Sequence, residues 1–140
     1  MWWKIVFVVK EFLKKNFVYL YFNNSLKLQT TSSGVTITGD ATATNFNTTS
    51  DQTLKTNVET LTGSLDAVKS LRGVSFDWLE NGNSEVGVIA QEVEAVLPDV
   101  VSTNDQGIKS VKYGNMVALL IEAMKEQQAQ IDELKAKLGE

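Results

Sequence analysis

A heptad repeat near the C-terminal end is the sequence feature that most constrains what this chain can fold into. At alternating spacings of three and four residues it places Val117, Leu120, Met124, Gln127, Ile131, Leu134 and Leu138. This period is typical of a helix that joins other helices along one seam, and beyond Met124 the other faces are mainly Glu, Gln, Lys and Asp. We expect a coiled coil over about residues 115–138, in which Gln127 is a polar core layer that sets register and copy number. A single amphipathic helix packed on its own domain is the alternative.

The residue types that are missing exclude several kinds of chemistry. The chain has 140 residues, 43% of them hydrophobic, and it contains no Cys and no His. Disulfides, thiol nucleophiles, Ser-His-Asp triads and histidine-based metal sites are therefore excluded. Nucleophilic chemistry would have to use Ser or Thr with a base such as Lys, Asp or Glu. We expect no metal and no cofactor.

The charge is divided unevenly and indicates three segments. Residues 1–24 carry four Lys and one Glu, a net +3, and residues 25–49 carry one Lys and one Asp, a net 0. Residues 50–140 carry eight basic and fifteen acidic side chains, a net −7. An acidic main domain argues against nucleic acid as a partner.

The N-terminal extension, residues 1–24, is hydrophobic and basic. Charged residues at Lys10, Glu11, Lys14 and Lys15 interrupt it, so it does not read as a membrane span or as a signal peptide. Read as a helix, residues 1–22 place apolar and lysine side chains on different sides, which would suit a membrane surface. We prefer an apolar flap on a partner chain or a poorly structured extension, and we consider a membrane partner the weaker interpretation.

Residues 25–49 are rich in Thr and alternate apolar residues at Leu26 and Leu28 and again at Val35 and Ile37. This pattern predicts a pair of short strands that need partners from other chains or from a longer fibre upstream.

Residues 50–140 read as an α+β domain, a small mixed helix and strand domain that leads into the long C-terminal helix. We predict an amphipathic helix over 51–71, with a break near Gly63-Ser64 where Ser64 could cap a second turn. A strand over 74–78, a turn over 81–83 and a helix over 90–97 that Pro98 stops come next. A hairpin around residues 104–107 precedes the final helix.

Ser50 and Lys55 form the one pair whose residue types are compatible with catalysis. A neutral lysine can remove the proton of a serine hydroxyl. Residues five apart in one helix lie about 140° apart around its axis, so Ser50 would have to lie before the helix with Lys55 reaching back. The alternative is that Ser50 is an ordinary helix N-cap.

Four ordered blocks of this chain resemble the intramolecular chaperone, or autoprocessing, domain of phage endosialidases, tailspikes and tail fibres, which also occurs in myelin regulatory factor. The blocks are Ser50-Asp51 with Leu54-Lys55 and Asn57-Val58; Gly73-Val74 with Phe76 and Trp78; Gly87 to Glu94 with Leu97-Pro98; and Ser110-Val111 with Tyr113 before Leu119 to Glu126. Thr53 departs from the family, which often has a basic residue there.

This resemblance implies a homotrimer that helps the fibre upstream to fold and then cuts itself free. Carried over, the nucleophile is Ser50, its base is Lys55 and the scissile bond is Thr49-Ser50. Supporting roles for Asp51, Asn57, Gln91 and Glu92 are left open, and for the last three the plainer interpretation is buried hydrogen bonding. Residues 25–49 would be the end of a fibre shaft and the upstream region the partner. We expect the protein in the virion before cleavage and in the host cytoplasm during assembly.

Such a base also needs a special environment. Free lysine has a pKa near 10.4, so a lysine base requires burial, which a trimer interface could supply once assembly is complete. A non-cleaving trimerisation cap that stays attached to the fibre is the alternative function.

Overall fold

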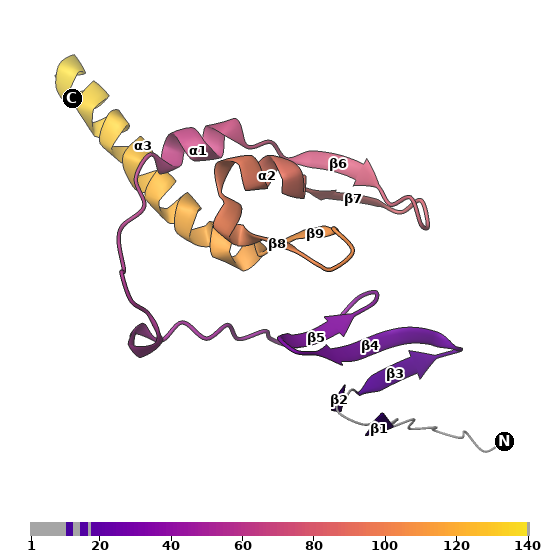
Figure 1. Ribbon diagram of the computed structural model, residues 1–140. Helices are drawn as coiled ribbons and strands as arrows, with labels where there is room; N and C mark the ends of the chain where they lie inside the picture. Colours follow the sequence, from indigo (N-terminus) through magenta and orange to yellow (C-terminus); the bar gives the residue numbers. More distant parts are fainter. Residues whose placement is uncertain (1–10, 13–14, 17, 140) are drawn as a thin grey trace. The chain divides into compact units, whose positions relative to one another are not determined.

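The computed structural model describes residues 11–12, 15–16 and 18–139, and the chain divides into two compact units, Met1–Leu54 and Lys55–Glu140. Within the described residues, the first unit contains only strands and a 3-10 turn, and the second mixes helices with two hairpins (Figure 1). The predicted α+β class is confirmed.

The first unit is built around a three-stranded antiparallel sheet. Strands β3 (Tyr19–Phe22), β4 (Ser25–Thr31) and β5 (Gly34–Ile37) are hydrogen-bonded in that order. The link from β3 to β4 is Asn23-Asn24, and both residues have positive φ, 47° and 61°, as a tight two-residue hairpin turn requires. The predicted strand pair is therefore confirmed, and β3 adds a third strand that the sequence pattern did not suggest.

The register of this sheet aligns an apolar row across it. Leu20 lies opposite Leu28, which in turn lies opposite Ile37. Leu20 and Ile37 are still 42% and 46% exposed, so the sheet buries little within its own chain. This agrees with the expectation that such strands need further partners.

Two short strands precede this sheet, in the segment that could be read as a helix over residues 1–22. Strands β1 (Glu11–Phe12) and β2 (Lys15–Asn16) form a small antiparallel pair, and β3 covers residues 19–22. The helical interpretation is therefore wrong for these stretches, and residues 1–10, 13–14 and 17 lie outside the described residues. Among the residues that the structure describes, no helix is both long and apolar enough to cross a membrane.

The second unit begins with helix α1 (Ser64–Ser70), which is much shorter than the predicted helix over 51–71. The preceding residue, Gly63, is in the left-handed region at φ 66°, and residues 55–63 are exposed and not helical. Thr53, Thr56, Thr60 and Thr62 are β-branched and favour a helix weakly, and most helical stability comes from packing. Only the part after Gly63 packs against another helix, so only that part is helical.

Two hairpins and a second helix follow, largely as predicted. Strands β6 (Val74–Asp77) and β7 (Ser84–Gly87) pair around a turn in which Gly82 has φ 72°. Helix α2 (Ala90–Val96) ends just before Pro98, which opens a 3-10 turn, η2 (Pro98–Val100). Strands β8 (Val101–Thr103) and β9 (Lys109–Val111) then pair, and the turn η3 (Tyr113–Asn115) leads into α3 (Met116–Leu138).

The core of the second unit is small and has two parts. Val93 and Val100 are buried where α2 packs on the β8–β9 hairpin, and Leu119 and Ala123 are buried where α1 packs on α3. Figure 1 shows α1 alongside α3, with the far end of α3 extending beyond it. Every residue from 127 to 139 is exposed, so the C-terminal half of α3 is not covered by its own chain.

Candidate functional site

The predicted scissile bond lies in an exposed stretch of the first unit. Residues 38–48, which form no helix or strand, separate Thr49 and Ser50 from β5. Every residue from 38 to 54 is exposed. Exposed backbone outside secondary structure is where peptide bonds are most readily cleaved. The accessibility that cleavage at Thr49-Ser50 would require is therefore present.

A tight turn follows Ser50 directly. The Asp51 carboxylate accepts hydrogen bonds from the Thr53 backbone N–H (2.8 Å) and the Thr53 hydroxyl (2.6 Å), and the Leu54 N–H donates to the Asp51 carbonyl (3.3 Å). These bonds hold the 3-10 turn η1 (Gln52–Leu54). The Thr53 hydroxyl, followed by the Thr53 amide, lowers the pKa of Asp51.

This turn gives Asp51 and Thr53 a structural role. The helix that Ser50 was expected to cap is absent, and the turn in its place is capped by the Asp51 side chain. Thr53, at the position where the family often has a basic residue, supplies both donors to Asp51.

The division between the two units falls between Leu54 and Lys55, so Ser50 lies near the end of the first unit and Lys55 opens the second. Lys55 is exposed in the single chain, as is Asn57, whose backbone is left-handed at φ 51°. The Thr56 hydroxyl donates to the Asn57 side-chain carbonyl at 3.5 Å. The expectation of buried hydrogen bonding is thus wrong for Asn57.

Gln91 and Glu92 lie on α2 in different surroundings. Gln91 is exposed, so the expectation of burial is wrong for it too, whereas Glu92 is half-buried. The Glu92 carboxylate accepts three hydrogen bonds from the Arg72 guanidinium: Nε donates to Oε2 at 2.9 Å and to Oε1 at 3.2 Å, and Nη2 donates to Oε1 at 2.7 Å. Arg72 lowers the pKa of Glu92, and the pair ties α2 to the segment after α1.

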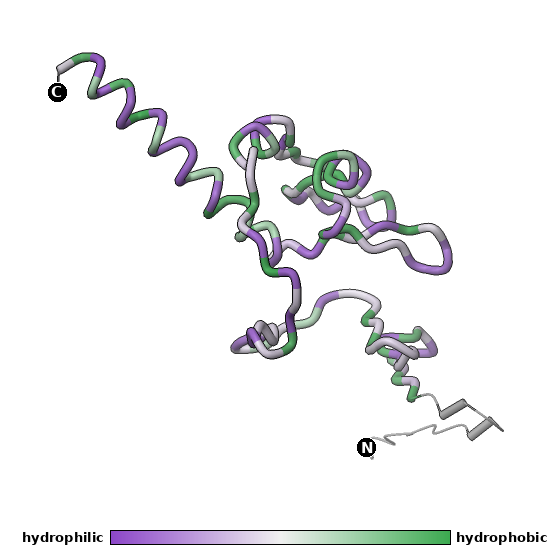
Figure 2. Tube along the Cα trace, turned by 60° about the vertical axis from the view of Figure 1, so that its left-hand side comes forward, coloured by the Kyte–Doolittle hydropathy of each residue, from purple (hydrophilic) through white to green (hydrophobic). Residues whose placement is uncertain are grey.

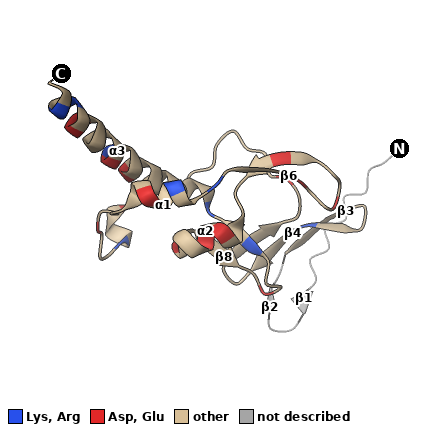
Figure 3. Ribbon diagram, turned by 90° about the horizontal axis from the view of Figure 1, so that it is seen from above, with Lys and Arg blue, Asp and Glu red and all other residues tan. Residues whose placement is uncertain are grey.

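Helix α3 carries the predicted seam on a side that its own chain leaves exposed. Val117, Leu120, Met124, Ile131 and Leu134 are 40–71% exposed, and Gln127 and Leu138 are exposed as well. Figure 2 shows apolar residues recurring along the full length of α3, and Figure 3 shows charges of both signs on its C-terminal half. Among the described residues, α3 packs on its own domain through a second, shorter stripe made of Leu119, Ala123 and Glu126, and the coiled coil stays a prediction.

One residue of this second stripe has a role that the sequence reading missed. The Glu126 carboxylate accepts hydrogen bonds from the backbone N–H groups of Ser64 (2.9 Å) and Leu65 (2.7 Å), the first residues of α1. Those bonds, chiefly the one from Leu65, lower the pKa of Glu126. The cap of α1 is thus Glu126 rather than Ser64, whose hydroxyl is buried and has no partner among the described residues. A glutamate three residues after Ala123, on the stripe of Leu119, was the available signal.

Gly87 and Tyr113, two residues of the recognised blocks, depend on each other. The Tyr113 hydroxyl accepts a hydrogen bond from the Val88 N–H at 3.2 Å. A Cβ on Gly87 would lie 2.8 Å from that hydroxyl oxygen, so any other residue at position 87 would displace it. Glycine therefore fits at position 87, where the Tyr113 side chain joins η3, the turn before α3, to the residue that follows β7.

Among the described residues, no group of three or more Asp or Glu side chains is arranged to hold a metal ion.

Comparison with known proteins gives matches to one family and to phage proteins. The family described as "Chaperone of endosialidase", which is named as a peptidase family, matches residues 50–102. The chain is 36% identical over 98 residues to the long tail fiber protein Gp37 of Enterobacteria phage K3, covering 64% of this chain and 8% of that protein. It is 33% identical over 107 residues to the protein of the same name from Salmonella phage S16, covering 68% of this chain and 14% of that protein.

The chain thus spans only a small part of the length of these relatives. The resemblance drawn from the four sequence blocks is confirmed, because residues 50–102 match the chaperone-of-endosialidase family.

Proposed function

We propose that this chain is the chaperone-bearing part of a phage tail fibre, in which residues 50–140 trimerise, help the strands upstream to fold and then release themselves by cutting Thr49-Ser50. The support that weighs most is where the family match begins. It starts at residue 50, the residue that the family resemblance implies as the nucleophile. The first matched residue is therefore the one that follows the proposed cut.

The proposed reaction balances with the groups of this chain and one water molecule. The Ser50 Oγ attacks the carbonyl carbon of Thr49, and its proton passes to the neutral Lys55 Nζ. The bond from the Thr49 carbon to the Ser50 nitrogen breaks, and Lys55 returns the proton to that nitrogen as it leaves. Water then hydrolyses the ester between Thr49 and the Ser50 Oγ, giving a Thr49 carboxylate and restoring the Ser50 hydroxyl.

The proposal makes cleavage depend on assembly. The proposed mechanism needs a neutral lysine, and the Lys55 side chain is exposed in the single chain. Burial disfavours the charged form of a lysine, and neighbouring chains are the available source of such burial. Cutting would then follow trimerisation, when the strands upstream have already been brought together.

The exposed seam of α3 supports the trimer. A helix that leaves seven heptad positions uncovered by its own chain gains stability only by pairing with other chains. The apolar row of the β3–β5 sheet supports the same conclusion for the strand segment, which we assign to the end of the fibre shaft. The chain would enter the virion as part of the fibre, after assembly in the host cytoplasm.

The test is the mass of the freshly purified protein and of three variants. The wild type should yield a product of residues 50–140, and Ser50→Ala and Lys55→Ala should stay whole. Lys55→Arg should stay whole too, because arginine keeps the positive charge but cannot lose its proton in a protein. Lys69→Arg is the matched control and should cut like the wild type, since the ion pair that Lys69 forms with Asp66 is exposed and arginine can keep it.

A non-cleaving trimerisation cap is the second candidate, and the same experiment separates the two. Cleaved Lys55→Arg would show that the lysine acts as a charge and not as a base. A wild type that stays whole and behaves like Ser50→Ala, while still forming trimers, would establish the cap instead.

A further inference from the structure

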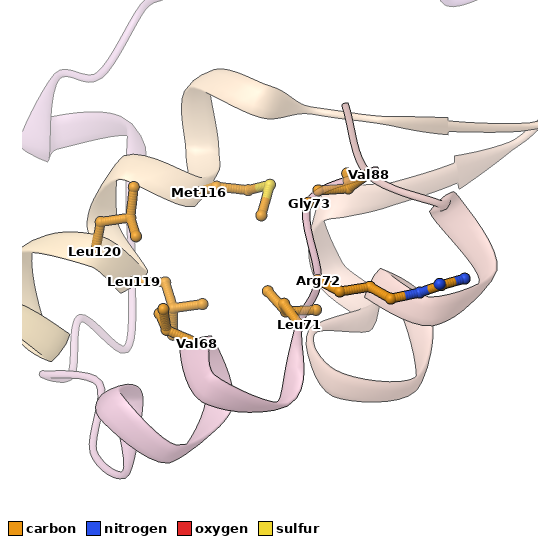
Figure 4. A pocket seen from close by; sticks show the side chains of 8 residues that line it. All are labelled: Val68, Leu71, Arg72, Gly73, Val88, Met116, Leu119 and Leu120. Atoms are coloured by element: carbon orange, nitrogen blue, oxygen red, sulfur yellow. The ribbon is translucent and has the colours of Figure 1, made fainter. Parts of the chain in front are cut away.

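An apolar pocket lies beside the exposed seam of α3. Its volume is about 260 Å³, and its apolar lining comes from α1, the β7–α2 link and the first turns of α3: Val68, Leu71, Val88, Met116, Leu119 and Leu120 (Figure 4). Gly73 forms part of its wall without a side chain, and the Arg72 side chain points away from it toward Glu92. A pocket so lined takes an apolar group rather than a charged one.

The position of the pocket on α3 suggests what fills it. With Val117 and Met124 at heptad position a and Leu120 at position d, Met116 falls at position g. Leu120 therefore belongs both to the seam and to the pocket, and Met116 flanks the seam. In a parallel coiled coil, position g of one helix faces position e of the neighbouring helix, five residues further along.

The residue five positions after Met116 is Ile121. Position e usually carries charged side chains, and the next two e positions of this helix, Gln128 and Lys135, are polar. Ile121 is 48% exposed in the single chain and stands out as an apolar residue at a flanking position. Leu119 and Ala123 of α3 pack against α1, so α1 forms the wall of the pocket on the side of α3 that carries position g. In a parallel coiled coil this side faces position e of the neighbouring α3 helix.

We infer that Ile121 of a second copy of this chain inserts into the pocket. Each chaperone domain then contacts the α3 helix of its neighbour through this pocket as well as through the seam. This inference rests on the proposed trimer and specifies one of its contacts. It makes the globular part of residues 55–126, and not the coiled coil alone, a determinant of copy number.

Sedimentation equilibrium of full-length variants on the Ser50→Ala background tests the contact. Ile121→Asp should raise the trimer dissociation constant at least about 100-fold, because it drives a carboxylate into an apolar pocket. Leu79→Asp is the matched control, since Leu79 is fully exposed on the β6–β7 turn, and it should leave the constant unchanged. Circular dichroism should show both variants folded.

A second pair of changes addresses the pocket from the other side. A Cβ on Gly73 meets no atom within 4 Å, so Gly73→Leu is accommodated in its own chain and fills the pocket. It should weaken the trimer as Ile121→Asp does, and Ile121→Ala should restore part of the loss when the two are combined, as expected for residues in contact.

Cysteines at the two facing positions give a direct readout. Residues five apart on one helix lie about 140° apart around it, so Met116→Cys and Ile121→Cys in one chain cannot bond each other. Under oxidation the double variant should run as a covalent trimer on a non-reducing gel. If the wild type is a trimer and Ile121→Asp leaves its dissociation constant unchanged, or if the double cysteine variant gives no covalent trimer, the inferred contact is wrong but the proposed trimer is not. A monomeric wild type would overturn the proposed function itself.

Discussion

Leu119 and Leu120 are neighbours on α3 with opposite surroundings, and their truncation separates folding from assembly. Leu119 is 4% exposed and packs against α1, whereas Leu120 is 48% exposed on the seam. Leu119→Ala should destabilise each chain by about 2–5 kcal/mol, the usual range for a buried leucine, at any protein concentration. Leu119→Ala should therefore lower the folding stability of each chain without depending on assembly.

Leu120→Ala should act mainly between chains. The three carbon atoms removed are worth about 2.4 kcal/mol when fully buried, at about 0.8 kcal/mol for each carbon. With 48% of the side chain still exposed, roughly half of that, about 1.2 kcal/mol, remains to be gained per chain on assembly. Three chains together give about 3.5 kcal/mol, which raises the trimer dissociation constant roughly 300-fold.

Sedimentation equilibrium and thermal melts over a wide range of protein concentration measure both effects. The melting temperature of Leu120→Ala should fall most at low concentration, and that of Leu119→Ala should fall by a similar amount throughout. Equal, concentration-independent losses for the two variants, or a trimer dissociation constant that Leu120→Ala leaves unchanged, would refute the assignment of the seam to an interface.

Three further predictions concern the cap, the polar layer and the N-terminal segment. In the folded chain the pKa of Glu126 is lowered, so the ionised carboxylate stabilises the second unit at pH values above the pKa of an unfolded glutamate. This stabilisation is lost as the pH falls through the lowered pKa. Glu126→Gln should therefore lower the stability of the second unit most near neutral pH. Urea melts should therefore converge with the wild type in acid, and a gap that widens in acid would contradict the capping role. Gln127→Leu should raise the melting temperature and broaden the distribution of oligomers, since it removes the polar layer; unchanged stability and a single species would argue against a core position. Deleting residues 1–22 should leave the melt of the second unit cooperative, because the buried side chains of that unit pack between its own helices and strands, and a lost transition would contradict this expectation.

Much of the second unit could be predicted because local signals agree with its packing. Pro98 stops α2, glycines at positive φ mark both hairpin turns, and the 3-4 spacing extends through α3. The helix predicted over residues 51–63 was wrong because periodic apolar residues make a helix only where another surface buries them. Leu54 and Val58 are both 72% exposed, so the described residues provide no such surface for them.

For the candidate site, the sequence could predict which residue types are able to carry the chemistry. Excluding Cys and His leaves Ser or Thr with a base such as Lys, Asp or Glu, and it is the resemblance of the four sequence blocks that assigns the roles to Ser50 and Lys55. Sequence could not supply the Glu126 cap, because it joins residues about sixty positions apart whose approach depends on how α1 packs against α3. The hydrogen bond between Tyr113 and Val88 escaped prediction for the same reason.

The uncovered end of α3 has a consequence for chains that find no partners. Residues 127–139 would form a helix about 20 Å long, and a segment of that length is only marginally helical by itself in water. In a lone chain this end should fray within nanoseconds to microseconds and offer unfolded peptide to cellular proteases, whereas in the trimer it is held closed. If the chain assembles as proposed, we therefore expect surplus single chains to be degraded through this segment, so that the amount of assembled protein follows the number of completed assemblies and not the number of chains synthesised.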